Sequence, residues 1–335
     1  MNSSSKYLLP LAKETAKQTA IIFLLLWQVI YAQNIRCRFC KEPIKSQYIV
    51  VEKSKYHKQC YKNHIQPKCN ICTRPIEGVY NIDGDKKYHK NCYEDFILPK
   101  CAVCTQPIKT TYIIDKWDNK YHKSHSKKLP NCESCNRLIC KRITKGGYNI
   151  GQDRNICNLC EPYAVDSKSR VNKYAREVKN ELRAVGFRDL PKNIPITLIS
   201  DRKRLKKLSK IKHINLSGYT HYEYETLNGK IVDKDYHIYI LSHLHEIEFK
   251  AVLAHEFLHV YLFQKDYKLS PEYREGFCNL GSQLIYENNN SKLAKQKIDS
   301  MYENPDPVYG MGFKKMNYVL KQNGWAELLR DLAKF

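Results

Sequence analysis

One spacing of cysteine and histidine repeats four times in the N-terminal half of this 335-residue chain. Each copy begins with Cys-x2-Cys, at Cys37, Cys69, Cys101 and Cys132, so the copies start 32, 32 and 31 residues apart. Each copy also ends with a second pair of metal-ligating side chains. A fixed period of this length is typical of repeated structural units that lie side by side along a chain.

The two pairs of each copy supply four soft ligands, which suit a tetrahedral zinc site that is filled entirely by protein and is therefore structural. Disulfide bonds explain the pattern less well, because histidine takes a ligand position in three of the copies. The predicted ligands of the four structural zinc ions are Cys37, Cys40, His57 and Cys60; Cys69, Cys72, His89 and Cys92; Cys101, Cys104, His122 and His125; and Cys132, Cys135, Cys157 and Cys160.

Each unit is too small to fold on apolar burial alone, so we expect metal binding to supply folding free energy. Alternating apolar residues, for example at 48–51 and 112–114, predict two short β-hairpins between the two ligand pairs of a unit. The units resemble LIM domains, tandem zinc fingers that bind proteins, although the linkers between fingers are longer here. We expect a LIM-like array over residues 35–162 that could bind a protein partner. Cys140 and Cys278 fall outside the pattern and are expected to be ordinary buried thiols.

A second motif lies far downstream, where the apolar stretch 251–263 contains His255-Glu256-x-x-His259. On a helix, positions i and i+4 share one face, so both imidazoles can bind one metal ion. Glu256 would then lie beside the open position of the metal and could take a proton from water. The apolar flanks predict a helix buried beneath a cleft, and argue against a surface helix that carries two histidines by chance.

A third ligand is expected from the helix that begins at Ser270-Pro271. Glu272 and Glu275 both fall in its first turns. Glu275 is followed by Gly276, and this pair looks like the Glu-Gly third ligand of zinc peptidases with a His, His and Glu set. We therefore favour Glu275 over Glu272 as the third ligand of a catalytic zinc.

The remaining C-terminal sequence alternates between helical and extended patterns. The strand at 236–241 is expected to form the upper edge of the cleft, where an extended peptide could pair with it. The predicted helices lie at 167–186, 202–210 (helix or loop) and within 290–335, and the predicted strands at 194–199, 219–226 and 236–241.

The first 32 residues have the layout of a signal peptide, with basic residues before a short apolar core and Ala32 as a small residue for cleavage. Because Ile30 is not ideal at the third position before the cut, an uncleaved N-terminal anchor is the alternative. Either reading predicts an exported protein, whether periplasmic, secreted or associated with the envelope. No stable membrane span is expected after cleavage, because the apolar core is short.

The formal net charge is +23, which favours acidic partners in general. Lysine and arginine are spread along the whole chain, and only residues 202–212 form a local basic run. Nucleic-acid binding is disfavoured, because no helix rich in base-reading residues follows each histidine and because the chain carries an export signal.

The C-terminal region, residues 163–335, resembles the DA-one family, in which LIM-type fingers precede a zinc peptidase. The matching stretches are 238–241, 254–259, 269–278 and 307–313, in that order. The resemblance implies zinc ligands at His255 and His259 and the catalytic glutamate at Glu256. It implies no substrate, and no ubiquitin-interacting helix precedes the fingers here.

These observations predict an α+β protein with four zinc-finger units followed by a zincin-type domain with a small sheet and an HExxH helix. The expected function is zinc-dependent hydrolysis of peptide bonds in protein or peptide substrates. The expected cofactors are one catalytic zinc, held by His255, His259 and Glu275, and four structural zinc ions. The alternative is a non-catalytic zinc-finger adaptor for protein interactions.

Overall fold

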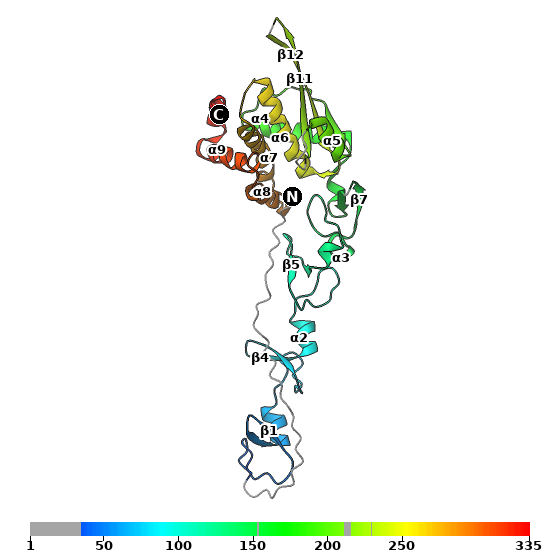
Figure 1. The fold of residues 1–335 in the computed structure, drawn as a ribbon, viewed down its shortest axis with the longest axis vertical. Coiled ribbons are helices and arrows are strands. Elements are labelled where there is room, and N and C mark those ends of the chain that lie inside the picture. The colour runs from blue at the N-terminus through cyan, green and yellow to red at the C-terminus, as the bar shows by residue number, and fades with distance from the viewer. Residues whose placement is uncertain (1–34, 153, 211–215, 229) are drawn as a thin grey trace. The chain divides into compact units, whose positions relative to one another are not determined.

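A computed structural model describes residues 35–152, 154–210, 216–228 and 230–335, so the predicted signal segment lies outside the described residues (Figure 1). The described chain is a mixed α+β structure with several small sheets. Contacts divide the chain into two compact units, Met1–His125 and Ser126–Phe335. None of the helices in the described ranges is long and apolar enough to cross a membrane.

The first unit contains three fingers of similar construction, and each has one antiparallel hairpin between its ligand pairs. The hairpins are β1 (Tyr48–Val51) with β2 (Ser54–His57), β3 (Tyr80–Asp83) with β4 (Lys86–His89), and β5 (Tyr112–Ile114) with β6 (Lys120–His122). The short helical segments are α1 (Lys58–Cys60), η1 (Tyr61–Ile65) and α2 (Lys90–Phe96), followed by η2 (His125–Lys127), which straddles the boundary of the units.

The prediction of two hairpins between the pairs is wrong. In place of a second hairpin, one isolated β-bridge spans the first Cys-x2-Cys pair, as at Arg36 and Pro43. Proline lacks a backbone N–H and cannot extend the ladder. The apolar core of a finger is also small, since in the second finger it consists of Cys69, Ile76 and Tyr88.

The fourth finger belongs to the second unit. Its elements are α3 (Lys141–Thr144), β7 (Gly147–Gly151) paired with β8 (Arg154–Cys157), η3 (Glu161–Tyr163) and β9 (Ala164–Val165). The last ligand of the fourth cluster is Cys160, whereas the packing boundary lies one finger earlier, after His125.

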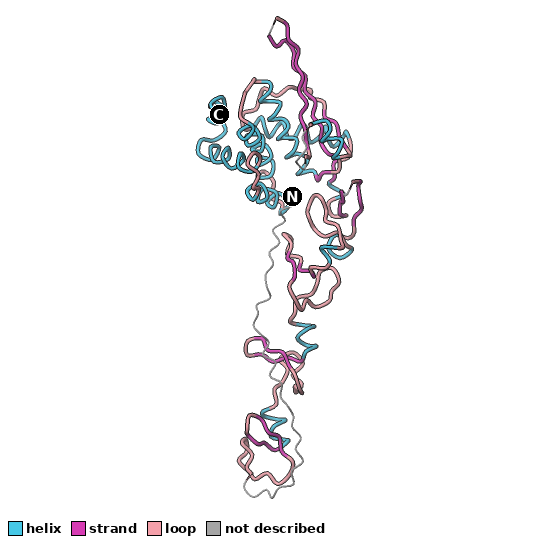
Figure 2. Tube along the Cα trace, viewed as in Figure 1, coloured by secondary structure: helices cyan, strands magenta, loops and turns pink. Residues whose placement is uncertain are grey.

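The rest of the second unit combines helices with a three-stranded sheet, and the long hairpin of this sheet is drawn in magenta at the top of Figure 2. Its strands are β10 (Ile196–Ile199), β11 (Gly218–Leu227), β12 (Lys230–Leu241) and the short β13 (Leu244–His245), which pairs with β9. Its helices are α4 (Lys168–Ala184), α5 (Arg202–Ser209), α6 (Glu246–Gln264), α7 (Pro271–Glu287), α8 (Lys292–Glu303), α9 (Gly310–Asp331) and η4 (Leu332–Lys334).

The sheet order is β10-β12-β11, with β10 parallel and β11 antiparallel to β12. Residues 236–241 lie in β12, and the expectation that they form an edge is wrong because both sides of this strand are paired. The two edge strands are β10 and β11. A peptide that adds to the sheet could pair with the outer side of either of these two strands.

Helix α6 lies at the centre of the second unit and contacts α4, α7, β11 and β12. Its apolar side chains, such as Phe249 and Phe257, are fully buried, as expected for a helix that is hydrophobic all round. At its C-terminal end, the Lys234 ammonium donates to the carbonyl oxygens of Phe263 at 2.9 Å and Gln264 at 3.2 Å. These contacts satisfy two carbonyl groups that the helix leaves without an internal partner.

Candidate metal centres

Four clusters of cysteine and histidine could hold metal ions, and they contain all sixteen ligands predicted for the fingers. In each cluster the four ligating atoms lie within 4.8 Å of one another. The clusters are Cys37, Cys40, His57 and Cys60; Cys69, Cys72, His89 and Cys92; Cys101, Cys104, His122 and His125; and Cys132, Cys135, Cys157 and Cys160. None of the fourteen cysteines forms a disulfide bond in the described structure, and the donor sets of the fingers are consistent with zinc.

The distances within the clusters fit a tetrahedral ion. Cys135 Sγ lies 3.8 Å from Cys157 Sγ, and two sulfurs that each lie about 2.3 Å from zinc at a tetrahedral angle would be about 3.8 Å apart. In the first finger, His57 Nδ1 lies 3.3 Å from Cys40 Sγ while its Nε2 lies 3.2 Å from the carbonyl oxygen of Pro43. Because a carbonyl can only accept, Nε2 carries the proton and Nδ1 is left free as the ligand.

Backbone N–H groups stabilise thiolates in these clusters. Burial alone would raise the pKa of Cys37, but hydrogen bonds from the backbone of Cys40, His57 and Phe39 lower it to about 6. Cys69, at the matching position of the second finger, has its pKa lowered to about 6 for the same reasons. The first cysteine of a finger is therefore prepared to bind a cation as a thiolate.

A further centre lies where α6 meets α7. His255 and His259 are one turn apart on α6, and their Nε2 atoms lie 3.1 Å from each other. Glu275 Oε2, from the second turn of α7, lies 3.4 Å from both of these nitrogens. Nitrogen and oxygen ligands about 2.1 Å from zinc at a tetrahedral angle would be about 3.4 Å apart, so these three atoms fit one ion.

Two other side chains are alternative candidates for the third ligand of this centre, Glu272 from the sequence and Cys278 from its position in the structure. Glu272 pairs instead with Lys315, at 2.8 Å. Cys278 lies one turn beyond Glu275 on α7, and its buried sulfur is within 4.8 Å of the ligating nitrogens of both histidines. The sequence predicts that Cys278 is an ordinary buried thiol. Because it lies three residues after Glu275 on α7, it shares the helix face that carries Glu275. Glu275 is the better third ligand, because its oxygen is at ligand spacing from both nitrogens.

The electrostatics of this centre favour a cation. Burial alone would raise the pKa of Glu275, but hydrogen bonds and charge interactions with His255 and His259 lower it well below its usual range. Burial alone would lower the pKa of His255, but Glu275 and Glu256 raise it. The pKa shifts of Glu275 and His255 have one common cause, because the buried carboxylates of Glu275 and Glu256 favour positive charge beside the imidazoles. A divalent ion would supply that charge.

Asn279 orients the first histidine, and sequence reasoning missed it. Its amide nitrogen donates to the carbonyl oxygen of Tyr309 at 3.0 Å, so its amide oxygen faces His255 Nδ1, also at 3.0 Å. His255 therefore carries its proton on Nδ1 and leaves Nε2 free, as outer-shell partners of metal ligands generally arrange. The available signal was its position, one turn after Glu275 on the same face of α7.

Glu256 is buried next to the edge strand β11. Thr220 Oγ1 lies 2.7 Å from Glu256 Oε2, and a Cβ on Gly218 would lie 2.5 Å from Glu256 Oε1. A side chain here would force the Glu256 carboxylate or the Val252 side chain to move, so the glycine leaves room for both. Strand β11 therefore passes directly over the residue expected to act as the base.

The segment 309–313 packs against the ligand-bearing helix. A Cβ on Gly276 would lie 2.3 Å from the carbonyl oxygen of Gly312, and a Cβ on Gly312 would lie 2.2 Å from that of Glu272. The two glycines let the start of α9 approach α7 beside Glu275. This close approach gives the segment Tyr309–Phe313 a structural role in supporting the centre.

Comparison of the sequence with models of known protein families and with curated proteins found no match in either set.

Proposed function

We propose that this protein is a zinc metallopeptidase of the DA-one type, with His255, His259 and Glu275 as ligands of the catalytic ion. The observation that carries the proposal is the triangle of their three ligating atoms, with sides of 3.1, 3.4 and 3.4 Å. Three protein ligands leave one vertex of a tetrahedron for water, as catalytic zinc sites require. When bound there, zinc would lower the pKa of that water and polarise a substrate carbonyl.

The protein's own groups have the remaining roles. Glu256 accepts a proton from the attacking water and returns it to the leaving amine. Thr220 holds the Glu256 carboxylate from the edge strand. The outer edge of β11, which pairs with no other strand in the described ranges, offers backbone N–H and C=O groups to an extended peptide, which suits a protein or peptide substrate.

The test compares wild type with Glu256→Gln in a proteomic cleavage screen, with metal analysis of both samples. We expect about five zinc ions per chain in both proteins, since glutamine leaves the ligands intact. Cleavage should be lost in the variant, because an amide cannot serve as the base. Cleavage by zinc-loaded Glu256→Gln would refute the mechanism.

The finger array is proposed to bind a protein partner, as a regulator or as a means of recruiting substrate. Large apolar side chains such as Phe39, Val79 and Phe96 are exposed on it, although single exposed apolar residues are common. The competing function is a non-catalytic adaptor. Metal analysis separates the two, because an adaptor with an inert second unit would bind about four zinc ions rather than five.

Export of the protein is also proposed, and this proposal depends only on the signal-like sequence of residues 1–32.

A further inference from the structure

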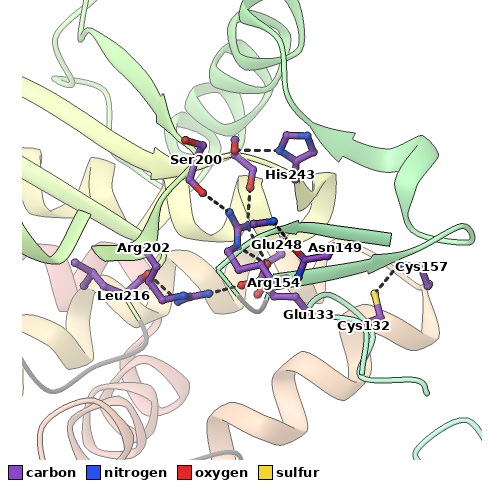
Figure 3. Close-up of polar contacts among 12 residues, drawn as sticks. Cys132, Glu133, Asn149, Arg154, Cys157, Ser200, Arg202, Leu216, His243 and Glu248 are labelled. Carbon is purple, nitrogen blue, oxygen red and sulfur yellow. Dashed lines mark hydrogen bonds and ion pairs between the residues drawn. The ribbon is translucent and has the colours of Figure 1, made fainter. Parts of the chain in front are cut away.

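A buried arginine joins the fourth finger to the three-stranded sheet of the same unit. Arg154, the first residue of β8, has a side chain that is only 4% exposed. Its guanidinium donates from Nη1 to the carbonyl oxygen of Ser200 at 3.1 Å and from Nη2 to that of Ser242 at 2.7 Å (Figure 3). These carbonyls follow β10 and β12 directly. An arginine stays charged, so its burial here depends on such partners.

Glu133 connects this arginine to the metal ligands of the finger. It lies between Cys132 and Cys135, and its Oε2 accepts from Arg154 Nε at 2.8 Å. Its other carboxylate oxygen pairs with Arg202, whose Nη1 donates to the carbonyl oxygen of Leu216 at 2.9 Å. One carboxylate in the metal-binding loop therefore pairs with two arginines, and both arginines donate hydrogen bonds to backbone carbonyls next to the strands of the sheet (Figure 3).

A second connection reaches the same place from the end of the finger. After Cys160 the chain runs through η3 into β9, where the carbonyl oxygen of Val165 accepts from the backbone N–H of His243 at 2.8 Å. Strand β9 then pairs with β13, and the rings of Tyr163 and His245 stack at 5.1 Å. Both connections thus hold the turn 242–245, which leads directly into α6.

We propose that the fourth finger is a positioning element for the HExxH helix, and that Arg154 is a positioning residue of the peptidase. The metal-loaded loop fixes the position of the Glu133 side chain, and Glu133 in turn orients the guanidinium of Arg154. Arg154 and β9 together hold the turn from which α6 starts. His255 lies about 14 Å further along that helix, so a shift or rotation of the turn changes the alignment of His255 and Glu256 with Glu275. Loss of metal from this finger alone lowers turnover while the catalytic ligands remain in place.

The inference rests on the proposed function for its kinetic consequence, and its test also has a readout independent of activity. The full-length, zinc-loaded chain is compared with Arg154→Lys and Glu133→Gln by hydrogen exchange and by steady-state kinetics. Lysine keeps the charge but cannot reach both carbonyls and Glu133 at once. We expect amides 241–247 to exchange about tenfold faster in both variants, with a lower kcat, a nearly unchanged KM and full zinc content.

The matched control is Arg142→Lys, an exposed arginine on α3 of the same finger, which should exchange and turn over as wild type does. Cys135→Ser, which removes a ligand of this finger, should speed exchange in the same amides. Wild-type exchange and kcat in folded Glu133→Gln overturns the inference, and this variant decides the matter if Arg154→Lys does not fold. Failure of the proposed function gives a different result, namely substrate cleavage by Glu256→Gln, and this result does not depend on the hydrogen-exchange rates.

Discussion

Thr220 and Glu256 are joined by a hydrogen bond of 2.7 Å that runs from the edge strand β11 to the helix α6. The hydroxyl donates and the carboxylate accepts, so the bond fixes the orientation of the side chain proposed as the base. Replacing threonine with valine keeps the shape and removes the donor. We expect Thr220→Val to lower kcat about tenfold through loss of this orientation.

Thr226→Val is the matched control for that measurement, since Thr226 lies on the same strand and is exposed. It should leave steady-state kinetics unchanged. A wild-type kcat in folded Thr220→Val would show that the hydrogen bond does not orient the base.

Asn279 should control metal affinity through His255. Removing its amide oxygen in Asn279→Ala takes away the acceptor 3.0 Å from His255 Nδ1. Outer-shell changes of this kind weaken metal binding by about 10 to 100-fold. Activity measured in buffers of defined free zinc reports the affinity of this centre. Asn279→Asp keeps an acceptor and should bind zinc more tightly than the alanine variant, and equal affinities of all three proteins would contradict the assigned role.

Glu275 and Cys278 can be separated as ligands by metal analysis. We expect Glu275→Gln to lose the zinc ion held by His255 and His259, because a weak neutral donor replaces the carboxylate that lies 3.4 Å from both nitrogens. We expect Cys278→Ser to retain about five zinc ions and cleavage activity. The reverse pattern, with zinc lost only in the serine variant, would make Cys278 the third ligand.

The close contact between α7 and α9 should be intolerant of any added side chain. In Gly312→Ala the new Cβ would lie 2.2 Å from the carbonyl oxygen of Glu272, so one helix must move. Overpacking of this kind destabilises by about 1–3 kcal/mol, and the shift should also displace Glu275 and lower kcat. The neighbouring, exposed Met311 provides the control variant Met311→Ala. Thermal unfolding and kinetics that match between the two variants would refute this account.

Protonation of His245 should destabilise the protein as the pH falls. His245 caps α6, and its Nδ1 accepts from the backbone N–H of Ile247 at 3.3 Å, which requires a neutral ring. Burial lowers its pKa from 6.5 to about 4. The folded state therefore resists protonation while the unfolded state accepts a proton, so stability is full above pH 6.5 and declines as the pH falls towards 4. The loss at acid pH is of order 3 kcal/mol.

The variant His245→Asn keeps a capping acceptor but does not titrate. Denaturant unfolding of both proteins at pH 7 and pH 5 isolates the effect, because the pH dependence of zinc binding is common to the two. We expect wild type to lose stability relative to the variant between these pH values. A constant difference would show that His245 does not titrate in this range.

The sequence by itself determined the ligand sets that depend on local geometry. Cys37 and Cys40 are brought together by one tight turn, and His255 and His259 by one helical turn, so spacing alone identifies them. The helix start at Ser270-Pro271 likewise follows from capping chemistry, since Ser270 accepts from the backbone of Tyr273.

Only the tertiary structure decided which distant groups meet. Spacing could not show that Thr220 reaches Glu256, that Asn279 orients His255, or that β10 and β11 rather than β12 are the edge strands of the sheet. It also could not show that the fourth finger packs as part of the second unit through Arg154. Each of these relations joins residues far apart in the chain, and each depends on how sheet and helices pack together, a choice that local spacing and propensity do not contain.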